Sequence, residues 1–185
     1  MEYVINVMDL YIKVKANYPL LQDRLAKYIV NDTSNINIDF CVELSNETMK
    51  KAQEEYKEAD QELIEYMLTG AIFYTKIIKY NAFLLHSSSV AVNNKAYCFS
   101  ADSGVGKSTH TGLYLKHFKD SYIINDDKPA YRLIDNKWYV YGTPWSGKYD
   151  ISKNVRIPLQ GICFIAHGLD NKVRKLDNKE AINKI

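Results

Sequence analysis

Residues 101–108, ADSGVGKS, constrain the fold more than any other segment of this chain. They follow the phosphate-loop pattern G-x-x-x-x-G-K-[ST], with Ala101 in the place of the first glycine. An apolar run typical of a strand, residues 96–99, precedes them, and a helical run begins at Lys107. A strand, a glycine-bearing loop and a helix in this order predict a phosphate loop within a domain of mixed α and β structure.

Phosphate binding explains the residue types in this loop. The backbone N–H groups of successive loop residues can point into one concavity, and glycine allows the positive φ and the close approach that this requires. The helix N-terminus adds partial positive charge, Lys107 adds a full charge and the Ser108 hydroxyl can bind Mg²⁺. A glycine turn that binds nothing gives no reason for Lys-Ser at its end. We therefore predict a site for ATP or GTP with Mg²⁺, formed by Asp102, Ser103, Gly104, Val105, Gly106, Lys107, Ser108 and Thr109.

Two adjacent acids lie about twenty residues beyond this loop. Asp126 and Asp127 follow the apolar run 122–124 and Asn125, where a carboxylate at a strand end can hold Mg²⁺. One acid can bind the metal while the other accepts a proton from an attacking hydroxyl. Ser108 and Asp127 are the candidate metal ligands, but the choice of base between the two aspartates stays open. The alternative is an Asx-turn with no ligand.

His86 is a further candidate for catalysis. It lies within the strand-like run 83–92, which we expect to pair with the strand that enters the phosphate loop. Such pairing would bring the imidazole near the phosphates, although a lone histidine in a strand is more often structural. The catalytic candidates are Asp126, Asp127, His86 and Lys107.

A second loop, GTPWSGK at residues 142–148, could line the same site. Lys148 could reach a γ-phosphate or an anionic acceptor, and hydroxyls in the loop could donate hydrogen bonds. The alternative is a loop at a hairpin end with its tryptophan packed on the core. Lys128 and Arg132 are interpreted as surface charges. The candidate acceptor or phosphate residues of this loop are Thr143, Trp145, Ser146, Gly147 and Lys148.

The rest of the chain alternates between strand and helix patterns. We expect strands at 3–5, 11–14, 36–42, 83–92, 95–100, 122–124 and 161–166, with a hairpin over 131–141. We expect helices at about 19–28, 46–68 and 107–116, whereas 71–80 fits either element. Ser45 or Asn46 would cap the long helix and Gly70 would follow its end. Asn93-Asn94 and Asp135-Asn136 predict tight turns.

These patterns divide the chain into two parts. Residues 1–80 are expected to form an N-terminal α+β lobe, and residues 81–185 a core around the phosphate loop. The last ten residues, LDNKEAINKI, look like the start of a helix, so we expect the chain to be truncated at its C-terminus.

Composition excludes several classes of partner. The net charge is +2, and no run of basic residues forms a patch for nucleic acid or a membrane surface. No apolar stretch approaches the roughly 18 residues of a membrane span, and the N-terminus lacks the features of a signal peptide. The three cysteines are isolated in apolar runs, which fits reduced, buried thiols. We expect a cytoplasmic protein.

The combination of His86, ADSGVGKS and Asn125-Asp126-Asp127 resembles the HPr kinase/phosphorylase catalytic domain, which belongs to the phosphoenolpyruvate carboxykinase-like P-loop superfamily. The resemblance covers about residues 80–165, and GTPWSGK is similar to the short HPr-kinase-like proteins. It implies a mixed, largely antiparallel β-core with a P-loop and flanking helices. It also implies that Asp126 or Asp127 is the general base with His86 beside it, and that Lys107 and Ser108 hold phosphate and metal.

The leading hypothesis is a Mg²⁺-dependent phosphotransferase that moves the γ-phosphoryl group of ATP to a hydroxyl, such as a serine of a peptide or small protein. One alternative is a non-catalytic ATP- or GTP-binding sensor or assembly module. Another is a kinase for a small molecule such as a free amino acid. The acceptor, the choice between ATP and GTP, and the oligomeric state, a homo-oligomer included, stay open.

Overall fold

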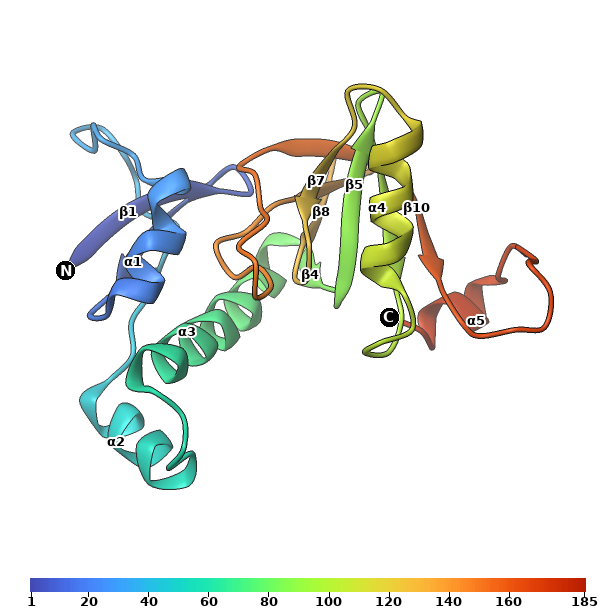
Figure 1. The fold of residues 1–185 in the computed structure, drawn as a ribbon. Helices are drawn as coiled ribbons and strands as arrows, with labels where there is room; N and C mark the ends of the chain where they lie inside the picture. The colour runs from blue at the N-terminus through green and yellow to red at the C-terminus, as the bar shows by residue number, and fades with distance from the viewer.

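Two β-sheets joined by helices form the fold in the computed structural model, which describes residues 1–185 (Figure 1). The smaller sheet has the order β1-β2-β3, with the strands β1 Glu2–Val7, β2 Leu10–Lys15 and β3 Phe40–Val42. The larger sheet has the order β4-β8-β9-β10-β6-β5-β7. Its strands are β4 Ala82–Leu84, β5 Ser87–Val92, β6 Lys95–Ser100, β7 Tyr122–Asn125, β8 Ala130–Ile134, β9 Lys137–Tyr141 and β10 Arg156–Phe164.

Only one neighbouring pair of strands in the larger sheet, β10 and β6, is parallel; all the others are antiparallel. The predicted mixed, largely antiparallel β-core is therefore confirmed. The α-helices are α1 Pro19–Leu25, α2 Asn46–Glu55, α3 Gln61–Ile77, α4 Lys107–His117 and α5 Asn178–Ile182, and the short 3₁₀ helices are η1 Ala26–Tyr28 and η2 Ile78–Tyr80. None of the helices has both the length and the apolar character that a membrane span needs.

The two predicted hairpin turns are confirmed. Asn93 and Asn94 join β5 to β6 with φ of +48° and +57°. Asp135 and Asn136 join β8 to β9 with φ of +48° and +60°. Asparagine and aspartate tolerate this left-handed region better than other residues with a side chain, and two such residues in succession suit the twist of a hairpin. Local chemistry thus sets the register of the strands that lead to the site.

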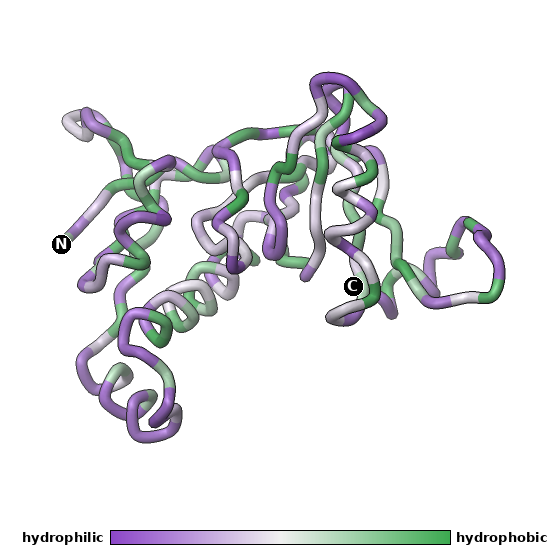
Figure 2. The backbone as a smooth tube through the Cα atoms, viewed as in Figure 1, coloured by the Kyte–Doolittle hydropathy of each residue, from purple (hydrophilic) through white to green (hydrophobic).

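The prediction of one helix over 46–68 was wrong. Ser45 does cap α2, because its Oγ accepts a hydrogen bond of 3.0 Å from the Thr48 N–H, but α2 ends at Glu55 and α3 begins at Gln61. Gly70, expected beyond the helix end, lies inside α3. The two helices differ in character, since α2 is mostly hydrophilic and α3 is largely hydrophobic (Figure 2).

Two strand predictions also need correction. Only Phe40–Val42 of the run 36–42 forms a strand, because β3 pairs with β2 over three residues and Ile38 remains 37% exposed. The run 83–92 is interrupted at Leu85 and His86, since β4 pairs with β8 whereas β5 pairs with β6 and β7. His86 therefore lies in a break between strands and not in the middle of one.

The largest hydrophobic cluster contains residues from both halves of the chain. It contains the inner faces of β1, β2, α1 and α3, together with Ala130, Tyr141 and Trp145 from the second half of the chain. A smaller cluster packs on one face of the larger sheet. On the other side of β5 and β6, α4 packs through Tyr114 against Phe99, with ring centroids 5.3 Å apart. Helix α3 thus lies next to the loops that carry the candidate site (Figure 1).

Candidate functional site

The phosphate loop leaves β6 and enters α4 as the sequence predicts. Gly104 and Gly106 have φ of +81° and +116°, so both positions use the left-handed freedom of glycine. Gly106 is the N-cap of α4, and no side chain caps the helix there. Because the first N–H groups of a helix have no intrahelical acceptor, the amides at the start of α4 are free to bind an anion.

Lys107 lies across its own loop. Its ammonium donates to the carbonyl oxygens of Ala101, at 2.7 Å, and Asp102, at 3.3 Å. A lysine ammonium has three N–H groups, so one remains for a phosphate oxygen. The Val105 N–H donates to the Asp102 carbonyl at 3.4 Å, which closes the turn.

A cavity of about 420 Å³ opens beside this loop. It gathers most of the predicted site residues: His86, Ser103, Gly104, Gly106, Lys107, Ser108, Thr109, Asp126, Asp127, Gly147 and Lys148. Asp102 and Val105, also predicted to bind nucleotide, do not line it and shape the loop instead.

Asn125 organises the turn that carries the two aspartates. This residue is fully buried at the end of β7, and its Oδ1 accepts hydrogen bonds from the backbone N–H groups of Asp127, at 3.0 Å, and Lys128, at 2.7 Å. Its Nδ2 donates to the carbonyl oxygen of Thr143 at 3.3 Å. The Asx-turn considered as an alternative is therefore present, and it places both carboxylates at the cavity.

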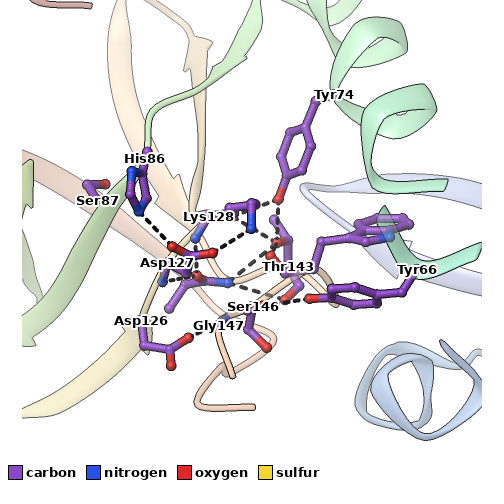
Figure 3. A network of polar contacts seen from close by, with 12 residues as sticks. Tyr66, Tyr74, His86, Ser87, Asp126, Asp127, Lys128, Thr143, Ser146 and Gly147 are labelled. Carbon is purple, nitrogen blue, oxygen red and sulfur yellow. Dashed lines mark hydrogen bonds and ion pairs between the residues drawn. The ribbon is translucent and has the colours of Figure 1, made fainter. Parts of the chain in front are cut away.

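Asp127 is held from two sides (Figure 3). One carboxylate oxygen, Oδ1, lies 2.8 Å from His86 Nε2, and the other, Oδ2, accepts from Lys128 Nζ. The carboxylate is largely shielded from solvent, with 23% of the side chain exposed. Lys128, interpreted from the sequence as a surface charge, thus belongs to the site. Arg132 instead donates to the Met8 carbonyl oxygen and ties the larger sheet to the β1–β2 turn.

Asp126 faces the second loop. Its Oδ1 accepts a hydrogen bond of 2.7 Å from the Gly147 N–H. Burial raises the pKa of the Asp126 carboxyl above its usual value, although the hydrogen bond from Gly147 acts in the opposite direction. A Cβ at residue 147 would lie 2.8 Å from Asp126 Oδ2, so the close approach of this carboxylate requires glycine.

The strand register brings His86 to the phosphate loop. Ser87 is opposite Ser100 in the β5–β6 ladder, so His86 lies beside the first residue of the loop. The Ser100 hydroxyl donates to the His86 carbonyl at 3.0 Å, and the Ser87 N–H donates to the Asp127 carbonyl at 3.0 Å. His86 thus lies between the phosphate loop and the aspartate turn, and its imidazole contacts Asp127.

The second loop divides into an inner and an outer part. Thr143, Trp145 and Ser146 are buried and do not line the cavity beside the phosphate loop, although Trp145 and Ser146 line a neighbouring one. The predicted alternative, a tryptophan packed on the core, is what the structure contains, because the Trp145 ring stacks on Phe73 with centroids 4.4 Å apart. Only Gly147 and Lys148 of this loop reach the cavity.

Three residues of the N-terminal half support this loop, and sequence reasoning gave them no role. Tyr74 donates from its hydroxyl to the Lys128 carbonyl at 2.8 Å, and Tyr66 donates to the Ser146 carbonyl (Figure 3). Arg24 donates to Ser146 Oγ at 2.7 Å. The only signal in the sequence was the helical spacing of Tyr66 and Tyr74, which does not reveal what that face of α3 contacts.

A second cavity, of about 680 Å³, adjoins the cavity beside the phosphate loop. We call the first the phosphate-loop cavity and the second the apolar cavity. It lies between α1, α3 and the two loops, and eight of its fifteen lining residues are hydrophobic. Asp127, Gly147 and Lys148 line both cavities. The Asp127 carboxylate therefore stands in the wall between them, with His86 on the phosphate-loop side and Lys128 on the other.

The donor set fits Mg²⁺ held together with phosphates. No group of three or more His, Cys, Asp or Glu side chains is placed to hold a metal ion by itself. Mg²⁺ usually needs only one or two carboxylates besides phosphate oxygens and water. Ser108 and Asp126 line the phosphate-loop cavity and offer a hydroxyl and a carboxylate of this kind.

No protein-family model matches this chain, and no curated protein matches it.

Proposed function

We propose that the protein transfers the γ-phosphoryl group of ATP to a hydroxyl group. The proposed acceptor is a serine in a peptide or small protein. The observation that carries this proposal is the position of Asp127 in the wall between the phosphate-loop cavity and the apolar cavity. A carboxylate at that point can contact an acceptor that enters from one side while the phosphates lie on the other. This is the place for a general base.

The phosphate-loop cavity holds the triphosphate in this proposal. The amides at the start of α4 and the Lys107 ammonium bind phosphate oxygens. Ser108 and Asp126 hold Mg²⁺, which neutralises the charge on the β- and γ-phosphates. Asp126 thus replaces Asp127, the metal ligand expected from the sequence, because Asp126 lines only the phosphate-loop cavity.

The reaction then forms one bond and breaks one bond at the γ-phosphorus, and moves one proton. The acceptor oxygen attacks the γ-phosphorus, the bond from the γ-phosphorus to the bridging oxygen breaks, and ADP leaves. The proton of the acceptor hydroxyl passes to the Asp127 carboxylate. His86 and Lys128 keep that carboxylate oriented through their contacts at its two oxygens, so both act as positioning residues. Catalysis of this type consists mainly of positioning and charge stabilisation.

Phosphoryl transfer from [γ-³²P]ATP to a mixed library of serine peptides tests the proposal. Lys107→Ala should abolish transfer, whereas Lys116→Ala, about 13 Å further along the same helix, should leave it unchanged. Asp127→Asn should lower transfer about 100-fold or more while ATP still binds, since a general base contributes on that scale. Wild-type protein that binds ATP but transfers nothing would favour the nucleotide-binding module instead.

A further inference from the structure

The residues that line the apolar cavity indicate what kind of molecule carries the acceptor hydroxyl. Its floor contains Tyr66, Gly70 and Tyr74, which follow one another at four-residue steps along α3. A Cβ at residue 70 would approach the Trp145 ring to 2.8 Å, so glycine keeps the helix close to the second loop and shapes the floor of the cavity.

The apolar lining continues onto the open surface of α3. Leu63 and Met67 line the cavity yet remain 42% and 57% exposed, and Ala71 extends their row by one more turn. We call Leu63, Met67 and Ala71 the α3 stripe. Large apolar side chains at such exposure are favourable contact surface for a partner, and methionine adapts readily to different ligands.

The dimensions of the stripe favour a chain over a single small molecule. Ala71 lies eight positions after Leu63, which corresponds to about 12 Å along the helix. An extended peptide rises about 3.3 Å per residue, so about four residues span this length. A free amino acid would leave most of the α3 stripe uncovered.

The two cavities together determine where the hydroxyl must be. Asp127, Gly147 and Lys148 form the junction, and Lys128 approaches Asp127 from the side of the apolar cavity. An occupant of the α3 stripe that continues to this junction meets the carboxylate there. The reacting residue therefore lies next to apolar residues of the acceptor and not within a polar segment.

We propose that the apolar cavity and the α3 stripe bind an extended peptide in which the phosphorylated serine is flanked, within two residues, by large apolar side chains. This inference rests on the proposed phosphotransferase function and adds the sequence preference of the acceptor. Leu63, Met67 and Ala71 are then residues that determine specificity, while Asp127 contacts the reacting hydroxyl.

This proposal is tested by measuring peptide binding to the full chain in the absence of nucleotide. The probes are fluorescein-labelled peptides KGLLSLLGK and KGGGSGGGK, measured by fluorescence anisotropy. Burial of even one leucine side chain predicts at least about tenfold tighter binding of the leucine peptide. Equal affinities, or no binding of either peptide, would overturn the proposal.

Matched variants locate the binding. Met67→Lys should weaken binding of the leucine peptide about fivefold or more, because it places a charge in the stripe. Ile78→Lys is the control, since Ile78 is also apolar and 65% exposed but does not line the cavity. Equal effects of the two lysine variants would overturn the assignment. Conversion of a dimer to a monomer by Met67→Lys in sedimentation would also overturn it and assign the stripe to a second copy of the chain.

A separate measurement distinguishes failure of this inference from failure of the proposed function. Binding of a fluorescent ATP analogue with Mg²⁺ depends on the phosphate loop and not on the α3 stripe. If the analogue binds and the peptides do not differ, only the acceptor preference is wrong. If the analogue does not bind, the phosphotransferase proposal fails whatever the peptides do.

Discussion

Gly70 provides the sharpest test of how α3 packs against the second loop. A Cβ at this position would lie 2.8 Å from Trp145 Cδ1 and 3.2 Å from Cγ. The indole cannot easily move away, because Trp145 is 1% exposed and stacks on Phe73. Its Nε1 also donates a hydrogen bond of 3.2 Å to Thr69 Oγ1. Gly70→Ala must therefore displace a side chain that is fixed on several sides.

Two effects of opposite sign decide the magnitude. Alanine in place of glycine inside a helix normally stabilises by up to about 1 kcal/mol. Overpacking of a filled core costs about 1–3 kcal/mol, so Gly70→Ala should lower the free energy of unfolding by about 1 kcal/mol. Gly112 in α4 is the matched control, because no heavy atom lies within 4 Å of its added Cβ. Gly112→Ala should raise the free energy of unfolding by about 0.5–1 kcal/mol.

Urea denaturation followed by far-UV circular dichroism measures both variants. The two substitutions are chemically identical, yet they should change stability in opposite directions, with a difference of about 2 kcal/mol. In a thermal scan, each kcal/mol corresponds to about 2–4 °C for a chain of this size. Equal stabilisation by both variants would refute the packing of Trp145 on α3, and with it the floor of the apolar cavity.

Gly142→Ala should prevent folding or cost more than about 3 kcal/mol in urea denaturation, because its Cβ would lie 2.0 Å from the Lys153 carbonyl oxygen; wild-type stability would contradict this. Asn125→Ala should lower the free energy of unfolding by about 2 kcal/mol or more in the same assay, since two backbone N–H groups lose their acceptor. Burial raises the pKa of the Cys98 thiol to about 12, so Ellman's reagent at pH 8 should modify exposed Cys41 quickly and Cys98 only after unfolding.

Local chemistry explains what could be predicted from the sequence. Asn93-Asn94 and Asp135-Asn136 identify their hairpins because the positive φ of a tight turn is a property of the residues themselves. The glycines of the phosphate loop, Gly104 and Gly106, are recognisable for the same reason. The break between α2 and α3 is not recognisable in the sequence, because residues 56–60 include lysine, glutamate and alanine, which favour helix and continue the helical pattern.

Contacts distant along the chain explain the rest. Tyr74 reaches the Lys128 carbonyl across 54 residues, and Arg24 reaches Ser146 across 122, so no local pattern could have shown them. The glycine at position 70 is explained by Trp145, whose ring occupies the space that a Cβ would need. Thr143 was expected to donate to a ligand, but its hydroxyl donates to the Lys128 carbonyl at 2.9 Å. The direction of a side chain within a loop depends on such partners.

Nucleotide binding by isothermal titration calorimetry tests the central claim most directly. With Mg²⁺ present, wild-type protein should bind ATP, and AMP should bind at least about tenfold more weakly because it lacks the β- and γ-phosphates that the loop amides and Lys107 hold. Lys107→Ala should weaken ATP binding about tenfold or more, and Lys116→Ala should leave the affinity for ATP unchanged. Equal affinity for ATP and AMP, or an unchanged affinity in Lys107→Ala, would contradict the assignment of this loop to the triphosphate.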